Sequence, residues 1–600
     1  MNNPLTGKSR LGWIVFPVLA LLLVLAVACG SAAQPAPADV QPADTSGNQQ
    51  PTPVPVAADT PTPVPQAVAG PAEVEVHPGK VTLLIGDFGT ERFDTIYGST
   101  GKEIRKNFHG HLTSWDLQDG RMVIVPGIAT KWELSNGGKT TTYTIREGVK
   151  FHDGSEVTAE DVLWTLQHAM GPQASDYAKN SVSINYATIM DRIEQPAPDQ
   201  VSVTTQVPSP ELAVYISENE GGASMGQVMP RRPSLHNEQE LEAYESKPIG
   251  AGPAKLVKHV PLESITFERF DDFFYQPENG FPTDKRYKFT ELELRQVPEE
   301  ATRAAALQAG EADIARVSLA TRDQVEAGGG RLVFSEESAI IESHLWGCWK
   351  PQFPCSDQRV RQALNYTVDK ELMRDRLFGG PEVMEIKGYW VVTPSTIGYS
   401  PELDPFPFDP DKARQLLAEA GYKTPTNPSG KDFGKLIINT YEDPVIPNLI
   451  ESAQLAAELW RQELGLDVEV RVMDKVAFNE TRTLAFEVFD GTVSWVAQNT
   501  RLDAGGITRL YFLTLQKGGP STRLHTDPEL FALVEETMAV TGQAEAEDTF
   551  NSTYRRLREE AYQISVGYID APWGVGPRIQ TWEPYRVAEY ASALHTITLK

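Results

Sequence analysis

The sequence predicts an α/β protein with a largely parallel sheet, preceded by an N-terminal leader and a linker. Between residues 431 and 495, strand-like and helix-like segments alternate: 436–438 is a predicted strand, 447–464 a helix that Gly465 ends, and 467–473 a strand. Helices between strands are typical of βαβ units. The chain has 600 residues, more than one hydrophobic core holds, and 40% apolar with 22% charged residues is typical of a globular protein.

Residues 1–29 form a predicted lipoprotein signal. Lys8 and Arg10 precede an uncharged run at 11–28, which ends in Ala-Val-Ala before Cys29. This pattern resembles bacterial lipoprotein signals, in which the cysteine is lipidated after cleavage, although Ala26 stands where the commonest signal has leucine. A retained transmembrane anchor is the alternative, since an apolar run of this length is just long enough to cross a bilayer. The position of Cys29 and the linker behind it favour lipidation.

Residues 30–79 form a predicted disordered tether. From Ser31 to Val76 the chain has no lysine, arginine or aromatic residue, and the sequence PTPVP occurs at 51–55 and again at 61–65. Such a composition buries too little apolar surface to offset the entropy lost on ordering. We expect a partly polyproline spacer that holds the folded body within roughly 100 Å of the membrane, at up to about 3 Å per residue.

The most patterned stretch of the folded body follows a buried-strand run near residue 80. Apolar and polar residues alternate at 143–145 and at 149–151, which predicts two short strands joined by a Glu147–Gly148 turn. Thr158 then stands at a helix N-cap position with Asp161 three residues later, the spacing of a capping box. The predicted helix collects apolar side chains on one face: Val162, Leu166, Ala169 and Met170.

The run REGVKFHDGSEVTAEDVLWTL at 146–166 resembles the signature of the large ABC-transporter solute-binding proteins of the oligopeptide, dipeptide and nickel type, called extracellular solute-binding protein family 5. Further stretches are similar to this family and occur in its order: 249–256, 307–314, 359–369 and 409–422. In the last of them Asp409 is a predicted N-cap, Pro410 stands in the first helical turn, and Gly421 ends the helix. On these stretches the chain is identified as a member of the family.

The resemblance implies an α/β, two-lobed periplasmic-binding-protein fold of type II, in the large class with an extra subdomain, and a hinge between the lobes. Lobe I would comprise 80–111, 250–345 and 560–600, with a subdomain at 112–249, and lobe II would comprise 346–559. A ligand that contacts both lobes favours the closed state, so we expect binding and closure to form one equilibrium.

The sequence gives little support to an enzyme. It has no H-E-x-x-H motif, and the segment 98–102 lacks both the glycine spacing and the Ser or Thr after lysine that a phosphate loop needs. His109 and His111 share one face of a strand, where two ordinary polar side chains are commoner than a metal site. We therefore predict no enzymatic activity, no cofactor and no metal. The net charge of −27 argues against nucleic acid as a partner.

Cys348 and Cys355 are the two cysteines that remain once Cys29 is lipidated. In an extracytoplasmic compartment a local disulfide across this loop is one alternative, and two free thiols are the other, because spacing alone does not establish the geometry. A zinc site needs more ligands than the loop offers.

The segment 489–503 carries the most informative predicted ligand contacts. By resemblance, Trp495 matches a tryptophan at a strand end that lines the ligand cavity, and Gln498 stands where peptide-binding members place the carboxylate that neutralises the ligand's α-ammonium group. We include the neighbouring Asn499 in the predicted site. Since Gln498 has no charge, we expect a ligand with a neutral, hydroxyl-rich or blocked end, for example an oligosaccharide. The open alternative is that Asp490, Asp503 or a carboxylate of the other lobe supplies the charge.

Three further aromatic residues are candidate ligand contacts: Trp346 near the expected crossing into lobe II, Trp573 near the return crossing, and Phe88 after the first strand. For each of them, packing between the lobes is an equally good interpretation.

These observations predict the extracytoplasmic, lipid-anchored solute-binding component of an ABC importer, at the outer face of the cell membrane. We expect a monomer that captures a peptide-like or other oligomeric solute between its lobes and delivers it to permease subunits, whose separate ATPase subunits drive import. The alternatives are an oligosaccharide-binding member of the same family, a ligand sensor that signals to a receptor, and an extracytoplasmic hydrolase.

The first testable prediction concerns the membrane anchor. Replacing Cys29 with serine is expected to block lipid attachment, because serine has no thiol for the lipid to be joined to. Incorporation of labelled fatty acid measures this, together with the mass of the N-terminal peptide of the mature chain. Fatty acid incorporation into the variant, or a mature N-terminus at another residue, would exclude the lipoprotein interpretation.

Overall fold

The computed structural model describes residues 77–97, 101–118, 121–179, 181–209, 212, 216–217, 225–443, 446, 448–484, 486–502, 504–505, 508, 526–540, 543–588 and 590–600. By contacts the chain divides into a unit at Met1–Ala69 and a unit at Gly70–Lys600, to which all described residues belong. The predicted signal with Cys29 and nearly all of the predicted tether lie outside the described residues. Within the described ranges, every helix is too short or too polar to cross a membrane.

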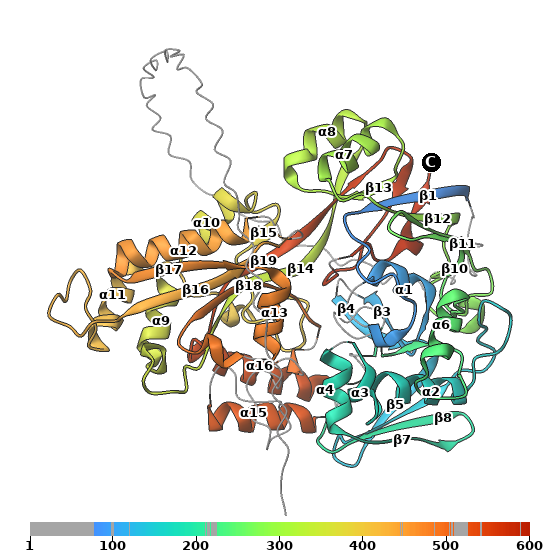
Figure 1. The fold of residues 1–600 in the computed structure, drawn as a ribbon, viewed down its shortest axis with the longest axis horizontal. Helices are drawn as coiled ribbons and strands as arrows, with labels where there is room; N and C mark the ends of the chain where they lie inside the picture. The colour runs from blue at the N-terminus through green and yellow to red at the C-terminus, as the bar shows by residue number, and fades with distance from the viewer. Residues whose placement is uncertain are drawn as a thin grey trace, which may run out of the picture. The chain divides into compact units, whose positions relative to one another are not determined.

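The largest sheet has eleven strands. Along the sheet the order is β10 (Ala254–Val260), β11 (Ser264–Arg269), β12 (Phe289–Gln296), β1 (His77–Ile85), β13 (Ile314–Arg316), β19 (Gln563–Val575), β14 (Arg331–Leu345), β18 (Val493–Asn499), β16 (Lys435–Tyr441) and β17 (Asp467–Met473), with β15 (Met384–Glu385) also paired to β19. We call β10, β11, β12, β1 and β13 strand group I, and β15, β18, β16 and β17 strand group II. The long strands β14 and β19 run from one group to the other (Figure 1).

The sheet is mixed, so the prediction of a largely parallel sheet is wrong. Parallel pairs occur within each group, where β1 runs beside β12 and β13, and β16 beside β17 and β18. The pairs formed by β14 and β19 are antiparallel, both to each other and to their neighbours β13 and β18. The parallel units around 431–495 were therefore a local pattern, and the joining strands have a different direction.

The two joining strands pair in two separate stretches. One stretch pairs 331–335 of β14 with 571–575 of β19, and the other pairs 339–344 with 563–569. Between them the register shifts, and Glu337 has a φ of 55°, in the left-handed region. Glu337 keeps one bond across this break, since its backbone N donates to Asp570 Oδ1 at 2.8 Å.

Smaller sheets surround the large one. A four-stranded sheet has the order β5 (Ala129–Ser135), β6 (Thr140–Ile145), β8 (Gln200–Thr205) and β7 (Met190–Ala197). The two-stranded sheets are β2 (Gly110–His111) with β9 (Gln227–Val228), β3 (Thr113–Gln118) with β4 (Arg121–Pro126), and β20 (Ile579–Thr581) with β21 (Thr598–Leu599).

The described α-helices range from one to five turns. They are α1 (Lys102–Phe108), α2 (Ala159–Met170), α3 (Ala174–Tyr177), α4 (Ser181–Ile189), α6 (Glu238–Ser246), α7 (Glu300–Ala309), α8 (Arg322–Ala327), α9 (Gln358–Tyr366), α10 (Lys370–Leu377), α11 (Pro410–Glu419), α12 (Leu449–Leu464), α13 (Lys475–Leu484), α15 (Pro528–Ala539) and α16 (Gln543–Glu559). Short 3₁₀ turns connect several of them, among them η1 (Thr95–Tyr97) and η3 (Leu319–Thr321).

Helix-end chemistry matches the sequence predictions. Thr158 and Asp161 form a complete capping box at the start of α2, and the predicted apolar face of this helix is buried. Asp409 caps α11 through the backbone N of Lys412, and Gly421 follows its end with a φ of 89°. The second strand predicted at 149–151 is absent, because residues 146–157 form turns closed by a single bridge.

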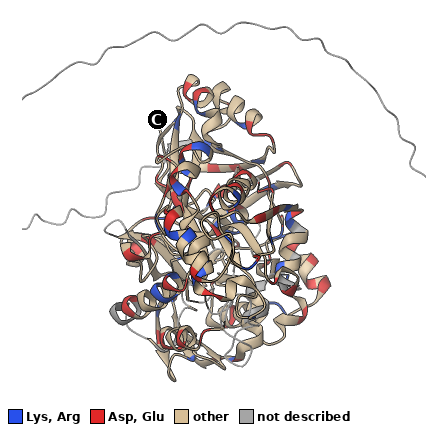
Figure 2. Cartoon of the chain, turned by 90° about the vertical axis from the view of Figure 1, so that its left-hand side faces the viewer, with Lys and Arg blue, Asp and Glu red and all other residues tan. Residues whose placement is uncertain are grey.

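The loop after β14 is closed by a disulfide between Cys348 and Cys355, with a Cα–Cα distance of 5.1 Å. Of the two alternatives left open by the sequence, the structure has the local disulfide. Elsewhere on the chain, lysines and arginines are interspersed with aspartates and glutamates over helices and strands (Figure 2).

A buried charged cluster connects η1, α2 and the segment after β9. Asp94 accepts hydrogen bonds from His168 Nε2 at 2.8 Å and from Arg232 at 2.6 Å, and the Asp94 and His168 side chains are fully buried. Burial alone raises the pKa of Asp94, but the charge and hydrogen bond of His168 and the charge of Arg232 outweigh it and hold this pKa well below its usual range. Asp94 is therefore an ionised, paired carboxylate inside the protein.

We predict that Asp94→Asn lowers the free energy of unfolding at pH 7 by about 3–5 kcal/mol, since it leaves Arg232 without its buried partner. The Asp94 pKa is lower in the folded than in the unfolded state, so its stabilisation is present above about pH 4 and is lost as the pH falls. The variant should therefore lose less stability on acidification. Urea unfolding at pH 7 and pH 3 measures both effects, with Asp191→Asn in an exposed pair as the control. Equal stability of Asp94→Asn and wild type at pH 7 would contradict the assignment.

Candidate ligand-binding site

A row of polar side chains lies on one face of β14 and β18. Glu342 and His344 are two residues apart on β14, and the register places Val496 and Ser494 of β18 opposite them, so Gln498 shares their face. Glu342 Oε1 lies 3.0 Å from His344 Nε2, and Gln498 Nε2 lies 3.1 Å from the same nitrogen. We call Glu342, His344 and Gln498 the polar row.

The carboxyl of Glu342 is fully buried. Burial raises its pKa well above the usual range, and Arg482 and the hydrogen bond to Gln498 only partly oppose this. Glu342 Oε2 has no hydrogen-bond partner among the described residues. A buried carboxyl with one oxygen unpaired favours its neutral form when no cation is near. Keeping this carboxyl ionised inside the protein would cost free energy.

Tryptophans and a glutamine surround the polar row. The rings of Trp346 and Trp390 lie 5.8 Å and 5.3 Å from the ring of His344. Their indole N–H groups donate to Ser494 Oγ and Thr508 Oγ1. Gln563 of β19, opposite His344, is fully buried, and neither its amide oxygen nor its amide nitrogen has a partner in the described part of the chain. The polar row thus lies among fully buried tryptophan rings, together with amide and carboxyl atoms that lack hydrogen-bond partners among the described residues.

Loop residues from three separate segments converge on Glu337, near the Gln498 end of this row. The Glu337 carboxylate accepts hydrogen bonds from the backbone N and Oγ of Ser395 at 2.9 and 3.0 Å, and from Arg586 at 3.3 Å. Thr500, two residues after Gln498, donates to the Glu337 backbone oxygen. The C-terminal end of β18 is therefore held to β14 at Glu337, where the pairing of β14 with β19 is interrupted.

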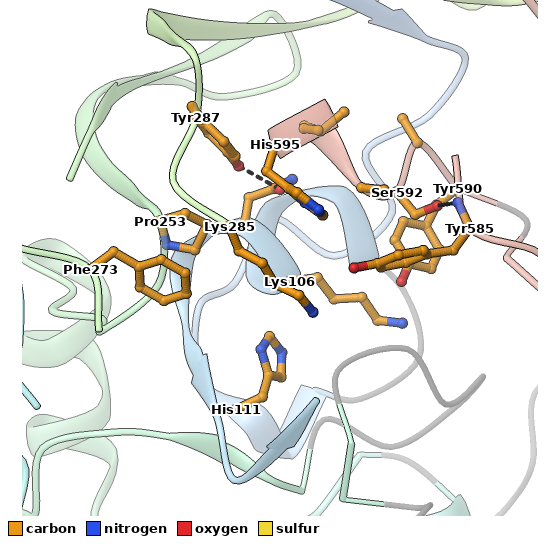
Figure 3. A pocket seen from close by; sticks show the side chains of 14 residues that line it. Lys106, His111, Pro253, Phe273, Lys285, Tyr287, Tyr585, Tyr590, Ser592 and His595 are labelled. Atoms are coloured by element: carbon orange, nitrogen blue, oxygen red, sulfur yellow. Dashed lines mark hydrogen bonds between the residues drawn. The ribbon is translucent and has the colours of Figure 1, made fainter. Parts of the chain in front are cut away.

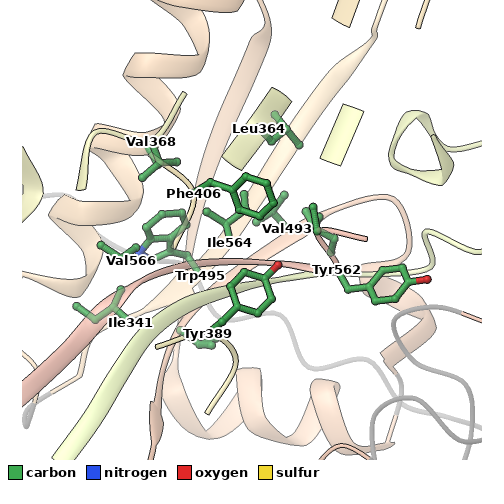
Figure 4. Close-up of a cluster of buried hydrophobic side chains, with 14 of the residues drawn as sticks. Ile341, Leu364, Val368, Tyr389, Phe406, Val493, Trp495, Tyr562, Ile564 and Val566 are labelled. Atoms are coloured by element: carbon green, nitrogen blue, oxygen red, sulfur yellow. The ribbon is translucent and has the colours of Figure 1, made fainter. Parts of the chain in front are cut away.

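Trp495 lies on the opposite face of β18 from Gln498. Its ring is fully buried among side chains such as Ile341 and Val566, and its indole Nε1 donates to Ser452 Oγ of α12 at 2.9 Å (Figure 4). The structure therefore places this predicted ligand contact in the hydrophobic core beneath α12. Its role in ligand binding stays a prediction.

The other predicted contacts are spread over the molecule. Trp346 lies beside the polar row, Gln498 belongs to it, and Asn499 follows at the end of β18, half-buried. Trp573 and Phe88 are buried in one apolar cluster built mainly by strand group I, where Trp573 contacts Trp582 edge-on at 5.8 Å. Of the predicted set, Gln498 and Asn499 adjoin at the end of β18, and Trp346 is linked to Gln498 only through the His344 ring between them.

Glu342 and His344 were not among the predicted site residues. Asp490, one source considered for the missing charge, pairs with Lys350 at the far end of β18, and Asp503 lies outside the described residues. The available signal was a Glu and a His two residues apart within the apolar run of 339–346, but it takes the β14–β18 register to place them beside Gln498.

A hollow of 60 Å³ lies between α1, β2 and the C-terminal segment. Lys106 and Lys285 extend toward the same space beside His111 (Figure 3). Burial and the nearby Lys106 charge hold the pKa of His111 well below its usual range. His109 Nε2 is bonded to the Phe93 oxygen at 2.7 Å. In the part of the chain that the structure describes, no three His, Cys, Asp or Glu side chains are placed to share a metal ion.

A G-x-S-x-G spacing occurs at 222–226, and Ser224 lies outside the described residues. The residues that follow it enter β9, which pairs with β2. The strand-to-helix turn that a nucleophile elbow needs does not follow this segment.

Comparison with models of known protein families shows to which family this chain belongs. A model described as bacterial extracellular solute-binding proteins, family 5 (middle), matches residues 123–506, more than half of the chain. The chain belongs to this family. It is a solute-binding protein of the kind that serves ABC importers, and the family consists of binding proteins rather than enzymes.

Known relatives cover most of the folded body. The chain is 23% identical over 492 residues to heme-binding protein A of Haemophilus influenzae, covering 76% of this chain and 84% of that protein. It is 27% identical over 376 residues to the glutathione-binding protein GsiB of Pectobacterium atrosepticum, covering 63% of this chain and 65% of that protein, just under two thirds.

The fold is that of solved family members. The oligopeptide-binding protein AppA of Bacillus subtilis, solved in complex with a nonapeptide, aligns with a TM-score of 0.64 at 19% identity, covering 88% of this chain and all of that one. The predicted two-lobed α/β binding-protein fold is therefore confirmed. The lobe bounds stay a prediction, and under them strand group I would fall in lobe I and strand group II in lobe II.

We predict that Trp495→Ala lowers the free energy of unfolding by about 3–5 kcal/mol, because a fully buried ring is removed and Ser452 loses its donor. Trp495→Phe keeps most of the ring and should lose less. Urea unfolding measures this, and calorimetry on the folded fraction measures ligand affinity separately. Unchanged stability of Trp495→Ala would exclude the core assignment. If Trp495 also contacts the ligand, the folded fraction of Trp495→Ala should bind that ligand roughly 100-fold more weakly than wild type.

Proposed function

We propose that this protein captures a peptide-like solute with a free ammonium group, and that Glu342 supplies the negative charge for it. The observation that carries the proposal is the buried carboxyl of Glu342 between His344 and Gln498, with Oε2 unused by the described residues. This proposal replaces the expectation of a neutral ligand, which rested on the absence of a charge at Gln498.

The charge state of Glu342 lets the proposed site distinguish cationic ligands from neutral ones. An ammonium group taken out of water requires a compensating charge, because an unpaired buried ion costs several kcal/mol. When such a ligand enters, its positive charge lowers the Glu342 pKa, and the carboxyl releases its proton as the ion pair forms. A neutral ligand gains no such pair. Binding of the cation is therefore coupled to the release of one proton.

The proposed setting is extracytoplasmic. Lipidation at Cys29 would anchor a monomer to the outer face of the membrane, the tether at 30–79 would give it reach, and hinge closure would present the loaded form to the permease. The relatives support a peptide-like solute, since they include a glutathione-binding protein and an oligopeptide-binding protein solved with a nonapeptide.

An oligosaccharide is the second candidate ligand. Trp346 and Trp390 offer aromatic faces, and the amides of Gln498 and Gln563 offer the neutral hydrogen-bonding groups that hydroxyl-rich ligands need. This candidate requires Glu342 to stay protonated and to donate a hydrogen bond to the sugar.

We predict that trialanine binds and that Glu342→Gln weakens this binding by roughly 30-fold, equivalent to about 2 kcal/mol. Because the neutral carboxyl and the amide have the same shape, the variant should fold normally. Affinity of the wild type should rise with pH, by up to about tenfold per unit below the Glu342 pKa. Isothermal titration calorimetry at pH 5, 6 and 7, in two buffers of different ionisation enthalpy, measures affinity and proton release.

The matched control is Glu451→Gln, an exposed glutamate on α12, which should leave trialanine binding unchanged. N-acetyl-trialanine and maltotriose serve as neutral ligands. Equal binding of trialanine and its acetylated form, or full affinity in Glu342→Gln, would reject Glu342 as the counter-charge. Tight binding of maltotriose alone would favour the oligosaccharide candidate.

A further inference from the structure

A cavity of 360 Å³ lies at the edge of β19 that faces away from β14. On this edge β19 pairs with β13 through residues 573–575 and with β15 through 568–569, so the residues between them lack a neighbouring strand. Two bonds bound this gap: Asp570 N donates to the Val383 oxygen at 2.8 Å, and Val317 N approaches the Pro572 oxygen at 3.5 Å. Asp570 and Pro572 thus form the floor of the cavity.

Both lobes build the walls. Arg316, Val317 and Leu319 come from the lobe I side, and Phe378, Gly379 and Val383 from the lobe II side. The two sides touch at the rim, where a Cβ added to Gly379 would lie 2.3 Å from Leu319 Cδ1 and where Arg322 pairs with Glu382. The contacts of Glu337 with Ser395 and Arg586 involve β14, which pairs with the other edge of β19. The cavity is therefore separate from the polar row.

Most polar groups that line the cavity are occupied by the protein itself. Arg303 donates to the backbone oxygens of Val297, Pro298 and Arg316, and Glu300 Oε1 accepts from Ser318 and Thr321. Asp570 differs, because Oδ1 accepts from Glu337 N and Oδ2 has no hydrogen-bond partner among the described residues. One carboxylate oxygen is thus available at the floor, between largely apolar walls.

The surroundings of Asp570 favour a cation. Burial first, and then the nearby carboxylates of Glu336, Glu337 and Glu385, raise the pKa of Asp570 to about 7 against the opposing hydrogen bond from the Glu337 backbone N. A positive charge beside Oδ2 would pair with Asp570 and reduce the repulsion among these acids. The apolar side chains of Leu319, Phe378 and Val383 would bury the carbon body of the same molecule.

We propose that this cavity is a second ligand site, which binds a small organic ammonium ion with an apolar body, its ammonium at Asp570 Oδ2 and its carbon atoms between Leu319, Phe378 and Val383. A ligand there touches both lobes, so it stabilises the lobe arrangement in which the two walls are this close.

The test uses 2-phenylethylamine and its neutral analogue 2-phenylethanol, with ligand-observed NMR titration of the full chain at pH 7.5. We expect saturable binding of the amine in the millimolar range and at least fivefold weaker binding of the alcohol. Asp570→Asn should remove this difference. Ala320→Trp, at the exposed rim, should fill the cavity and abolish binding of both probes without disturbing the core.

Two further variants separate this site from other acids. Asp375→Asn, which removes an exposed aspartate of α10, is the control and should bind the amine like wild type. Glu342→Gln tests whether the amine goes to the polar row instead, and the difference between amine and alcohol at the cavity should persist in it. Loss of binding in Glu342→Gln would assign the amine to the polar row and overturn the proposal. Equal binding of amine and alcohol by wild type, full binding in Ala320→Trp, or no saturation up to 20 mM amine would also overturn it.

Discussion

The pairing of β14 with β19, the two strands that run from one lobe to the other, is the constraint on which both lobes depend. Each strand belongs to both halves of the sheet, so the chain passes between lobes as paired strands rather than as free loops. Besides a register shift between Ile341 and Glu342, their pairing breaks between Ser335 and Ala339, where Glu337 adopts a left-handed conformation and bonds to Asp570. The polar row and the cavity at Asp570 lie beside this break, so a change of lobe angle moves the walls of both.

Buried carboxyls in this protein differ in charge because their neighbours differ. Asp94 accepts hydrogen bonds from His168 and Arg232 and has a pKa below the usual range, whereas burial dominates at Glu342 and raises its pKa above that range. The first arrangement stabilises a fixed structure, and the second suits the counter-charge role proposed for Glu342. The chemistry of the side chain is similar, and the position of nearby cations decides between the two roles.

Local patterns in the sequence predicted local structure well. The capping box of Thr158 and Asp161, the Pro410 helix start and the strand at 467–473 depend on residues close along the chain, and the structure has each of them. The mixed direction of the sheet and the partners of Gln498 depend on which distant strands pair. A match at Trp495 could locate a strand end but could not tell which face of β18 the ring occupies, since one residue of register reverses the faces. Glu342 was not predicted for the same reason, because its place beside Gln498 depends on the register between β14 and β18.

The neutral form of Glu342 also bears on the empty protein. Closing the lobes over an ionised, unpaired carboxylate would cost several kcal/mol, and that cost would keep unliganded molecules open. A carboxyl that takes up a proton avoids most of this cost, so a fraction of the empty population can close as well. Under the role proposed for Glu342, closed but empty molecules would compete with loaded ones for the same docking surface on the permease. Their share would fall as the pH rises, so the acidity outside the cell would help to determine how selectively the importer is served.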